Sequence, residues 1–432
     1  MPGMEGQLQQ GRWLQPVSLI AWLVVLVLLA LTPANTKMGG VLWLMLVVWG
    51  GWAWLRDWRS HGEPGDEGAW RVARVWLGFC LAGVACKLAG VLYWDDPIGT
   101  RHFEMRVGLS ACAVYLLVRS VRPRGVDADA LRWTLLAAAV VGLAVSGAHA
   151  YWGVETPSNR INWAGGLVMF AFVQIALLRL GASGRELGVM AGSAALFLLS
   201  VLLTGARGAY LVVPWLVISV FWGAWICSAR PWSQRLLSAI KLAMLVVALS
   251  SVVAVLLPKV VEVPLQRLDM AVDEAVATLA GDRDANYVNS SVGVRLQFWQ
   301  HAVRAIQEQP WLGYGRAQRI AFIQAWADEV GSEEMKRQIH VHSEYLNGML
   351  DHGVLGLMST LSFMAAFLAS AWVARRWNRF AAIGLLGLGV LHVLMSITDT
   401  NTGTNNYGVM MSLSVAMILL ARPGMGIRGT SS

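Results

Sequence analysis

The stretch HVHSEYLNGMLDHGVLGL, residues 340–357, places three histidines among carboxylates at the start of an apolar run. Imidazole and carboxylate groups can bind metals or accept protons, so a metal site and a general base are both open. The possible ligands are His340, His342, His352, Glu344 and Asp351. A His-x-His pair alone is a weak zinc signal, and on a helix that starts near 342 Glu344 faces away from His352. We therefore favour a histidine base over a metal centre, with an interfacial helix cap as the third interpretation.

Two arginines stand where a guanidinium can hold an anion. Arg207 lies between Gly205 and Gly208 in the turn TGARG, which leaves no room for a water-exposed loop between two apolar runs. The guanidinium and the backbone N–H groups at the start of the next helix then point toward a common position, as an anion-binding site requires. The alternative is an arginine that anchors the hairpin to lipid phosphates. Arg295 lies beside the apolar stripe of a predicted helix, and its alternative is an ordinary surface arginine.

The elements that position these groups are membrane helices. Hydrophobic residues make up 56% of the 432 residues, charged residues make up 14%, and the mean hydropathy is +0.54. Soluble domains average about 25% charged residues, so the composition predicts an all-α polytopic membrane protein. About twelve segments are apolar enough to cross a bilayer. These predicted spans are 17–35, 40–55, 73–93, 104–121, 133–150, 162–180, 188–204, 208–227, 239–257, 353–374, 380–398 and 407–421.

Lysine and arginine residues concentrate in the N-terminus and in every second short loop. The positive-inside rule therefore places both termini in the cytoplasm and the long segment 258–352 on the outer face, which is periplasmic in a bacterial inner membrane. The basic loops explain most of the net charge of +8, so no nucleic-acid partner is expected. The four cysteines all lie in apolar runs, and the N-terminus reads as a retained first span.

The chain thus divides into three parts. Residues 1–257 hold transmembrane helices 1 to 9, residues 258–352 form a helical periplasmic loop, and residues 353–432 hold helices 10 to 12 and a short cytoplasmic tail. In the loop, a helical stripe of apolar residues ends at Pro310 and the glycines of WLGYG. A second helix is predicted over 317–330, and a third starts near His342 with Ser343 as its N-cap. The stripe consists of Val292, Leu296, Trp299, Val303 and Ile306.

Unusual polar residues gather at the predicted outer face and not at the centres of the spans. They are Asp95, Asp96, Arg101, Asn159, Arg160, Asn162, Arg207 and the segment DTNTGTNN at 399–406. The exception is Lys87, which is either a functional charge or a lysine that snorkels to an interface or pairs with a carboxylate. Chemistry at the outer membrane surface explains this distribution most simply.

Four local motifs resemble the O-antigen ligase and polymerase superfamily, whose members are GT-C glycosyltransferases. LLTGARGAYL resembles its Ser/Thr-x-x-Arg-Gly hairpin, and SVGVRLQFWQHAVRAIQEQPWLGYG is similar to its Arg-x-x-x-Trp helix with the glycine motif that follows. VHSEYLNGMLDHGVLGL resembles its histidine and Gly-x-x-Gly motif, and SNRINWAGG is a looser match. His342, Arg207 and Arg295 fall on the family's histidine and two functional arginines, and Asp399 matches an acidic position weakly.

The resemblance implies an undecaprenyl diphosphate-linked glycan donor, inversion at the anomeric carbon and catalysis without metal or other cofactor. His342 would act as the general base, and Arg207 and Arg295 would hold the diphosphate. The leading hypothesis is a ligase that joins O-antigen to lipid A–core at the periplasmic face. The protein would be surrounded by membrane lipids. An O-antigen polymerase and a protein O-oligosaccharyltransferase are alternatives, and a lipid-linked glycan transporter is the alternative of another class. Possible supporting residues are Arg160, Asn162, Asp399, Glu344 and Lys87.

Overall fold

The computed structural model of the chain consists almost entirely of α-helices. It describes residues 67–97, 103–121, 126–156, 159–227, 255–281, 284–400 and 405–422, with scattered positions in 44–55 and 231–244. The helices are α4 (Glu67–Tyr93), α5 (Phe103–Val121), α6 (Ala128–Trp152), α7 (Arg160–Ala176), α8 (Gly184–Leu203), α9 (Arg207–Tyr210), α10 (Val213–Cys227), α12 (Lys259–Leu279), α13 (Ala285–Val288), α14 (Ser291–Glu308), α15 (Gly315–Val330), α16 (Glu333–Lys336), α17 (Glu344–Ala374), α18 (Arg379–Thr398) and α19 (Asn405–Leu420). A two-residue parallel pair joins β1 (Val126–Asp127) to β2 (Ala421–Arg422).

Six described segments are long and apolar enough to cross a membrane, and each matches a predicted span. They are α4, α6, α8, the stretch Arg207–Cys227 that combines α9 and α10, α17 and α18. Three further predicted spans fall on α5, α7 and α19, and the latter two are shorter apolar helices. The predicted spans 17–35, 40–55 and 239–257 lie wholly or largely outside the described residues, so the total of twelve stays a prediction.

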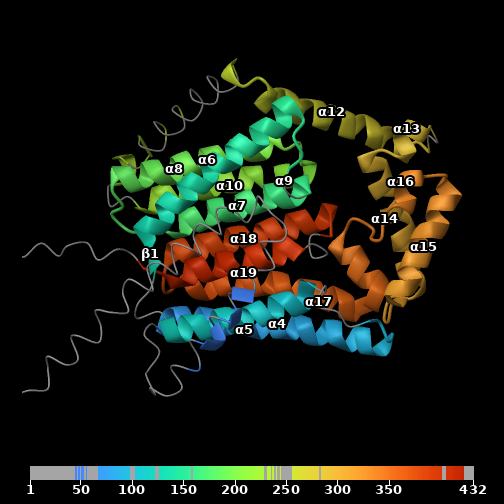
Figure 1. Ribbon diagram of the computed structural model, residues 1–432, viewed down its shortest axis with the longest axis horizontal. Helices are drawn as coiled ribbons and strands as arrows, with labels where there is room; N and C mark the ends of the chain where they lie inside the picture. Colours follow the sequence, from blue (N-terminus) through green and yellow to red (C-terminus); the bar gives the residue numbers. More distant parts are fainter. Residues whose placement is uncertain are drawn as a thin grey trace, which may run out of the picture.

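Helix α7 lies at the centre of the bundle, between α6, α8 and α10 on one side and α18 and α19 on the other (Figure 1). Every residue from Asn162 to Ala176 is buried, as expected of a helix that is apolar all round. Gly165 and Gly166 allow this close packing, because a Cβ on either would lie within 3 Å of a methionine side chain of α18 or α19.

Helix α17 connects the bundle to helices α12 to α16, and it bends at the point where it leaves the bundle. His352 and Gly353 have non-helical backbone angles, and Gly353 has a φ of 57°. A Cβ at Gly353 would lie 2.3 Å from the backbone of Trp311, so glycine is required for the WLGYG loop to dock here. The N–H of Tyr314 donates to the carbonyl of Leu350 at 2.7 Å. The loop that follows α14 is thus attached to the bend in α17 by backbone hydrogen bonds.

Helices α12 to α16 form a cap at one end of the bundle (Figure 1). The predicted helices of the loop are confirmed to within a few residues, and Gly331 ends α15 in the left-handed conformation. The predicted apolar stripe of α14 is confirmed in part. Trp299 and Ile306 pack against the cap core, but Val303 is 43% exposed, and the buried centre of the face is formed by Val294, Phe298 and Ala302. Because alanine is small, α14 packs closely against the rest of the cap at these positions. The larger side chain of Val303 lies outside the core of the cap. The cap core comprises Val294, Phe298, Ala302, Ala305, Ile323, Ala327, Met335, Val341 and Leu350.

Helix α12 was not predicted, although it forms one wall of the site described below. It starts beside the C-terminal end of α6, where the Lys259 ammonium donates to the carbonyl of Ala150, and it packs against α14. One face of α12 is apolar and exposed, with Leu265 and Val276 among its residues. The other face turns a carboxylate, Glu274, toward Arg207.

Candidate active site

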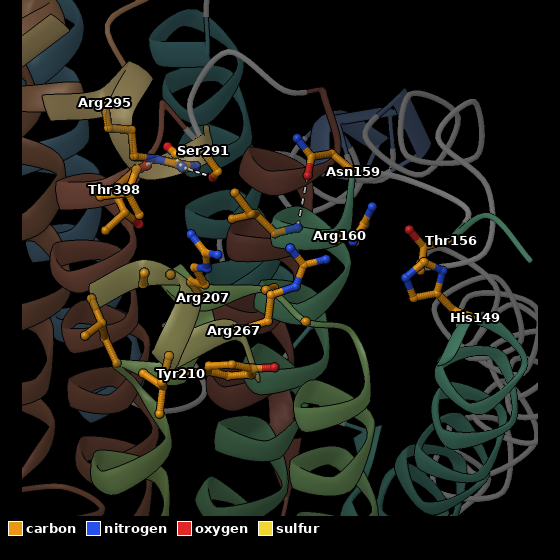
Figure 2. A pocket seen from close by; sticks show the side chains of 18 of the residues that line it. His149, Thr156, Asn159, Arg160, Arg207, Tyr210, Arg267, Ser291, Arg295 and Thr398 are labelled. Carbon is orange, nitrogen blue, oxygen red and sulfur yellow. Dashed lines mark hydrogen bonds between the residues drawn. The ribbon is translucent and has the colours of Figure 1, made fainter. Parts of the chain in front are cut away.

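A cavity of about 1130 Å³ lies between one end of the bundle and the cap. Its walls come from α7, α9, α12, α14 and the end of α18, and Figure 2 shows four guanidinium groups gathered around it. The charged residues that line it are Arg160, Arg207, Arg267, Arg295 and Glu155. The described wall therefore carries a large excess of positive charge, which favours an anionic ligand.

Arg207 begins α9 and is held by a carboxylate from α12. Its two terminal nitrogens donate to the Oε atoms of Glu274 at 2.9 and 3.1 Å, a bidentate pair that is largely buried. Burial alone would raise the pKa of Glu274, but the hydrogen bonds from Arg207 and from the N–H of Val292 lower it below its usual range. Glu274 therefore stays ionised and fixes the direction of the guanidinium.

Arg295 projects from α14 toward the end of α18. Its Nε donates to the carbonyl of Thr398 at 2.9 Å, and one terminal nitrogen donates to the carbonyl and hydroxyl of Ser291. Burial and the nearby positive charge of Arg207 lower its pKa, while Asp399 opposes the shift. The guanidinium is thus held in place by neutral oxygens and keeps its charge for another partner.

Two further arginines complete the basic wall. Arg267 on α12 and Arg160 at the start of α7 both line the cavity, and neither forms a hydrogen bond or an ion pair with any described residue. Burial is the main cause of the lowered pKa of Arg267, and the positive charges of Arg160 and Arg207 add to it. Arg160 was predicted as a supporting residue, but Arg267 was missed because no motif marks it.

His342 lies beside this cavity but does not line it. Its Nδ1 is 3.2 Å from Oδ1 of Asp399, the residue after the cavity-lining Thr398. The backbone at His342 has a φ of 51°, a conformation rarely adopted outside glycine, so the surrounding cap holds the ring in a strained position. Burial would raise the pKa of Asp399, yet the hydrogen bond and the charge of His342 lower it. The pair joins an ionised carboxylate to a histidine next to Arg295.

The structure also brings His340, one of the possible metal ligands in the sequence, against His342. The ring centroids lie 4.6 Å apart, edge to face. Burial lowers the pKa of His340 to about 4, and the neighbouring His342 adds to this shift. His340 is therefore neutral at physiological pH.

Three predicted supporting residues lie away from the cavity wall. Asn162 is buried in α7, and Glu344 on α17 accepts a hydrogen bond of 2.6 Å from Ser396. Lys87 is buried in α4 within a set of mixed charges, which we call the ionic latch. The latch consists of Lys87, Asp96, Arg319, Asp351 and His352.

The latch also holds His352, one of the possible metal ligands. Its Nε2 lies 3.0 Å from Oδ2 of Asp96, whose carboxylate also accepts the N–H of Arg316. The Nε of Arg319 donates to Asp351. These contacts join α4, the cap and α17, so His352 and Asp351 are not available to the His342 cluster.

The described helices and the cavity are those of a membrane protein with an arginine-lined cavity beneath a helical cap. A model of the O-antigen ligase family matches residues 192–361, which include Arg207, Glu274, Arg295 and His342. This part of the chain is therefore similar to an O-antigen ligase domain, and the resemblance predicted from the motifs is confirmed over these residues. The family match indicates activity of the glycosyltransferase type. A search of the curated proteins found no match.

Proposed function

We propose that this protein transfers O-antigen polysaccharide from undecaprenyl diphosphate to a sugar hydroxyl of lipid A–core at the periplasmic face of the inner membrane. The observation that carries the proposal is the cationic cavity beside the His342–Asp399 pair. A diphosphate leaving group accumulates negative charge, and an acceptor hydroxyl must lose a proton. The two kinds of group needed for these tasks lie next to each other at one end of the bundle.

The arginines are suited to the diphosphate. A guanidinium has five N–H donors, and the pair with Glu274 requires only two of those on Arg207. The Nε of Arg207 is buried and has no hydrogen-bond partner among the described residues. Arg207 can therefore bind phosphate oxygens while Glu274 holds it, and Arg295 and Arg267 can contact the same group from α14 and α12.

His342 is suited to the hydroxyl. When its Nδ1–H donates to Asp399, Nε2 carries the lone pair that can accept a proton. The acceptor oxygen forms its bond to the anomeric carbon as its proton passes to His342. The bond from that carbon to the phosphate oxygen breaks on the opposite side, and the electron pair leaves with the diphosphate. The anomeric configuration inverts in this single displacement, and arginines supply the charge stabilisation without a metal ion.

The test uses the purified full chain in lipid nanodiscs with a synthetic undecaprenyl diphosphate glycan. One arm offers lipid A–core as acceptor, a second arm offers another lipid-linked glycan, and each is run with and without chelator. We expect transfer to lipid A–core that the chelator does not reduce. Transfer to the second lipid-linked glycan alone would show a polymerase and overturn the ligase assignment.

His342→Ala identifies the base in the same assay. We expect a loss of roughly 100- to 10,000-fold in rate, the usual contribution of a positioned proton acceptor. His301→Ala is the matched control, because His301 stacks on Trp326 within the cap and contacts neither the arginines nor Asp399 in the described structure. Wild-type turnover by His342→Ala would remove this histidine from the mechanism.

A further inference from the structure

We propose that His340, His342 and Asp399 form a binding site for a divalent transition-metal ion such as Zn²⁺, and that the bound ion inhibits glycan transfer. The inhibitory effect rests on the proposed function, because a metal ion bound to the imidazole of His342 would prevent this residue from acting as the general base. The binding itself rests only on the geometry of the three side chains.

The three side chains converge from two segments far apart in the sequence. One ligand atom from each lies within 4.8 Å of the others. Nδ1 of His342 and Oδ1 of Asp399 are already 3.2 Å apart, close to the roughly 3.3 Å that separates two ligands of a tetrahedral zinc ion. A shift of the His340 ring toward this pair would complete three corners of the tetrahedron, with the fourth left for water.

His340 supplies a second, independent observation. Its Nδ1 is buried and has no hydrogen-bond partner among the described residues. A buried polar nitrogen without a partner is costly, and a ligand that uses its lone pair removes that cost. Val341, between the two histidines, is fully buried in the cap core. The rings of His340 and His342 on either side of this anchor are in contact, with centroids 4.6 Å apart.

The ligand set selects the kind of ion. Two imidazoles and one carboxylate suit zinc and other late divalent ions, whereas magnesium prefers an octahedral shell of oxygens. Arg295 lies near Asp399 and Arg319 lies near His340, so both cations oppose a bound dication. An exchangeable inhibitor therefore fits the surroundings better than a permanent structural ion.

The structure changes the ligand set that the sequence offered. His352 and Asp351 belong to the ionic latch, and Glu344 bonds to Ser396. The carboxylate of the cluster is instead Asp399, which follows His342 by 57 residues and which the sequence suggested only as a possible supporting residue.

Binding is tested by titrating the purified full chain in nanodiscs with Zn²⁺, with Mg²⁺ as the comparison ion. We expect one zinc per chain, X-ray absorption that reports two imidazoles and one carboxylate, and no binding of Mg²⁺. His340→Ala should weaken zinc binding at least 10-fold, and His301→Ala should leave it unchanged. Equal zinc affinity in wild type and His340→Ala, or no zinc binding by wild type, would overturn the proposal.

Inhibition is then tested in the transfer assay. Zinc should slow wild-type transfer reversibly, with recovery on addition of chelator, and should slow His340→Ala only at concentrations at least 10-fold higher. Transfer by the wild type that zinc leaves unchanged, despite measured binding, would overturn the inhibitory role. Because absorption and titration need no turnover, they still decide the binding site if the proposed transfer reaction fails.

Discussion

The cavity and the ionic latch both hold charged residues at the end of the bundle that bears the cap, but they differ in the balance of positive and negative charge. In the latch, carboxylates and cations alternate, and Arg319 with Asp351 and His352 with Asp96 form close pairs. On the cavity wall, four arginines gather around a space of about 1130 Å³, and Glu274 pairs with one of them. The latch is a filled contact between elements, whereas the cavity holds unbalanced charge around empty volume.

This difference distinguishes a structural cluster from a binding site. Charges that satisfy one another need no ligand, and their removal is felt as lost stability. Like charges held close together raise the free energy of the folded chain until an anion joins them, and such arrangements are typical of functional sites. Lys87 stands out in the sequence as a charge inside a span. Its place in the latch favours the interpretation that it pairs with carboxylates.

Of the changes that compare the cavity with the latch, the largest effect is expected from Arg207 and Arg295 on the cavity wall. Arg207→Lys and Arg295→Lys each keep a positive charge but lose the guanidinium fork, so we expect transfer rates to fall roughly 100- to 1000-fold. Thermal denaturation in nanodiscs should show that both variants stay folded. Normal turnover in both would remove the diphosphate role from these residues and make the cavity no different from the latch.

The latch should show the opposite pattern. Asp351→Asn leaves the guanidinium of Arg319 buried without its counterion, and we expect the free energy of unfolding to fall by about 3 kcal/mol. The folded fraction should still transfer glycan at close to the wild-type rate per molecule. Glu329→Gln, at an exposed site on α15, is the control for loss of a carboxylate. A specific loss of transfer in stable Asp351→Asn would place the latch in the active site.

Local patterns predicted much of the fold and the centre of the site. Apolar runs identified six described spans, and short motifs marked Arg207, Arg295 and His342. The alternation of polar and apolar residues also located α15, because Gly331 supplies a clear end. These features depend on residues within a few turns of one another, which is the range over which a sequence pattern can be interpreted.

The remaining parts depend on contacts between distant segments. Glu274 pairs with Arg207 across 67 residues, and no motif marks either Glu274 or Arg267. The neighbourhood of His340 and Asp399 forms only when the end of α18 meets the start of α17. The centre of the buried face of α14 was missed, because it includes Ala302 and Ala305, and alanine gives a weak hydrophobic signal. Charge balance likewise cannot be read from spacing, since it depends on which helices face each other.

A moderate effect is expected from Arg267, which forms no hydrogen bond or ion pair with any described residue. Its replacement therefore removes one positive charge from the cavity wall without breaking such a contact. Arg267→Gln should raise the KM for the lipid-linked donor roughly 10-fold, as expected for the loss of one charge-assisted hydrogen bond to the diphosphate. Stability should stay unchanged or rise slightly, because repulsion from Arg160 and Arg207 is relieved. Arg304→Gln on α14, outside the cavity wall, is the control. An unchanged KM would show that the donor does not reach α12.

The smallest effect concerns the pH dependence of the link between Asp399 and His342. The folded pKa of Asp399 is lowered from its ordinary value of 3.8, so its stabilising contribution is present above that value and is lost as the pH falls through the lower folded value. We expect wild type to exceed Asp399→Asn by about 1 kcal/mol in stability, with the carboxylate staying charged from pH 7 down to pH 5. Thermal denaturation at a series of pH values measures the difference. A difference that already disappears near pH 5 would mean that Asp399 gains its proton there, and His342 would then lack the ionised partner that orients it.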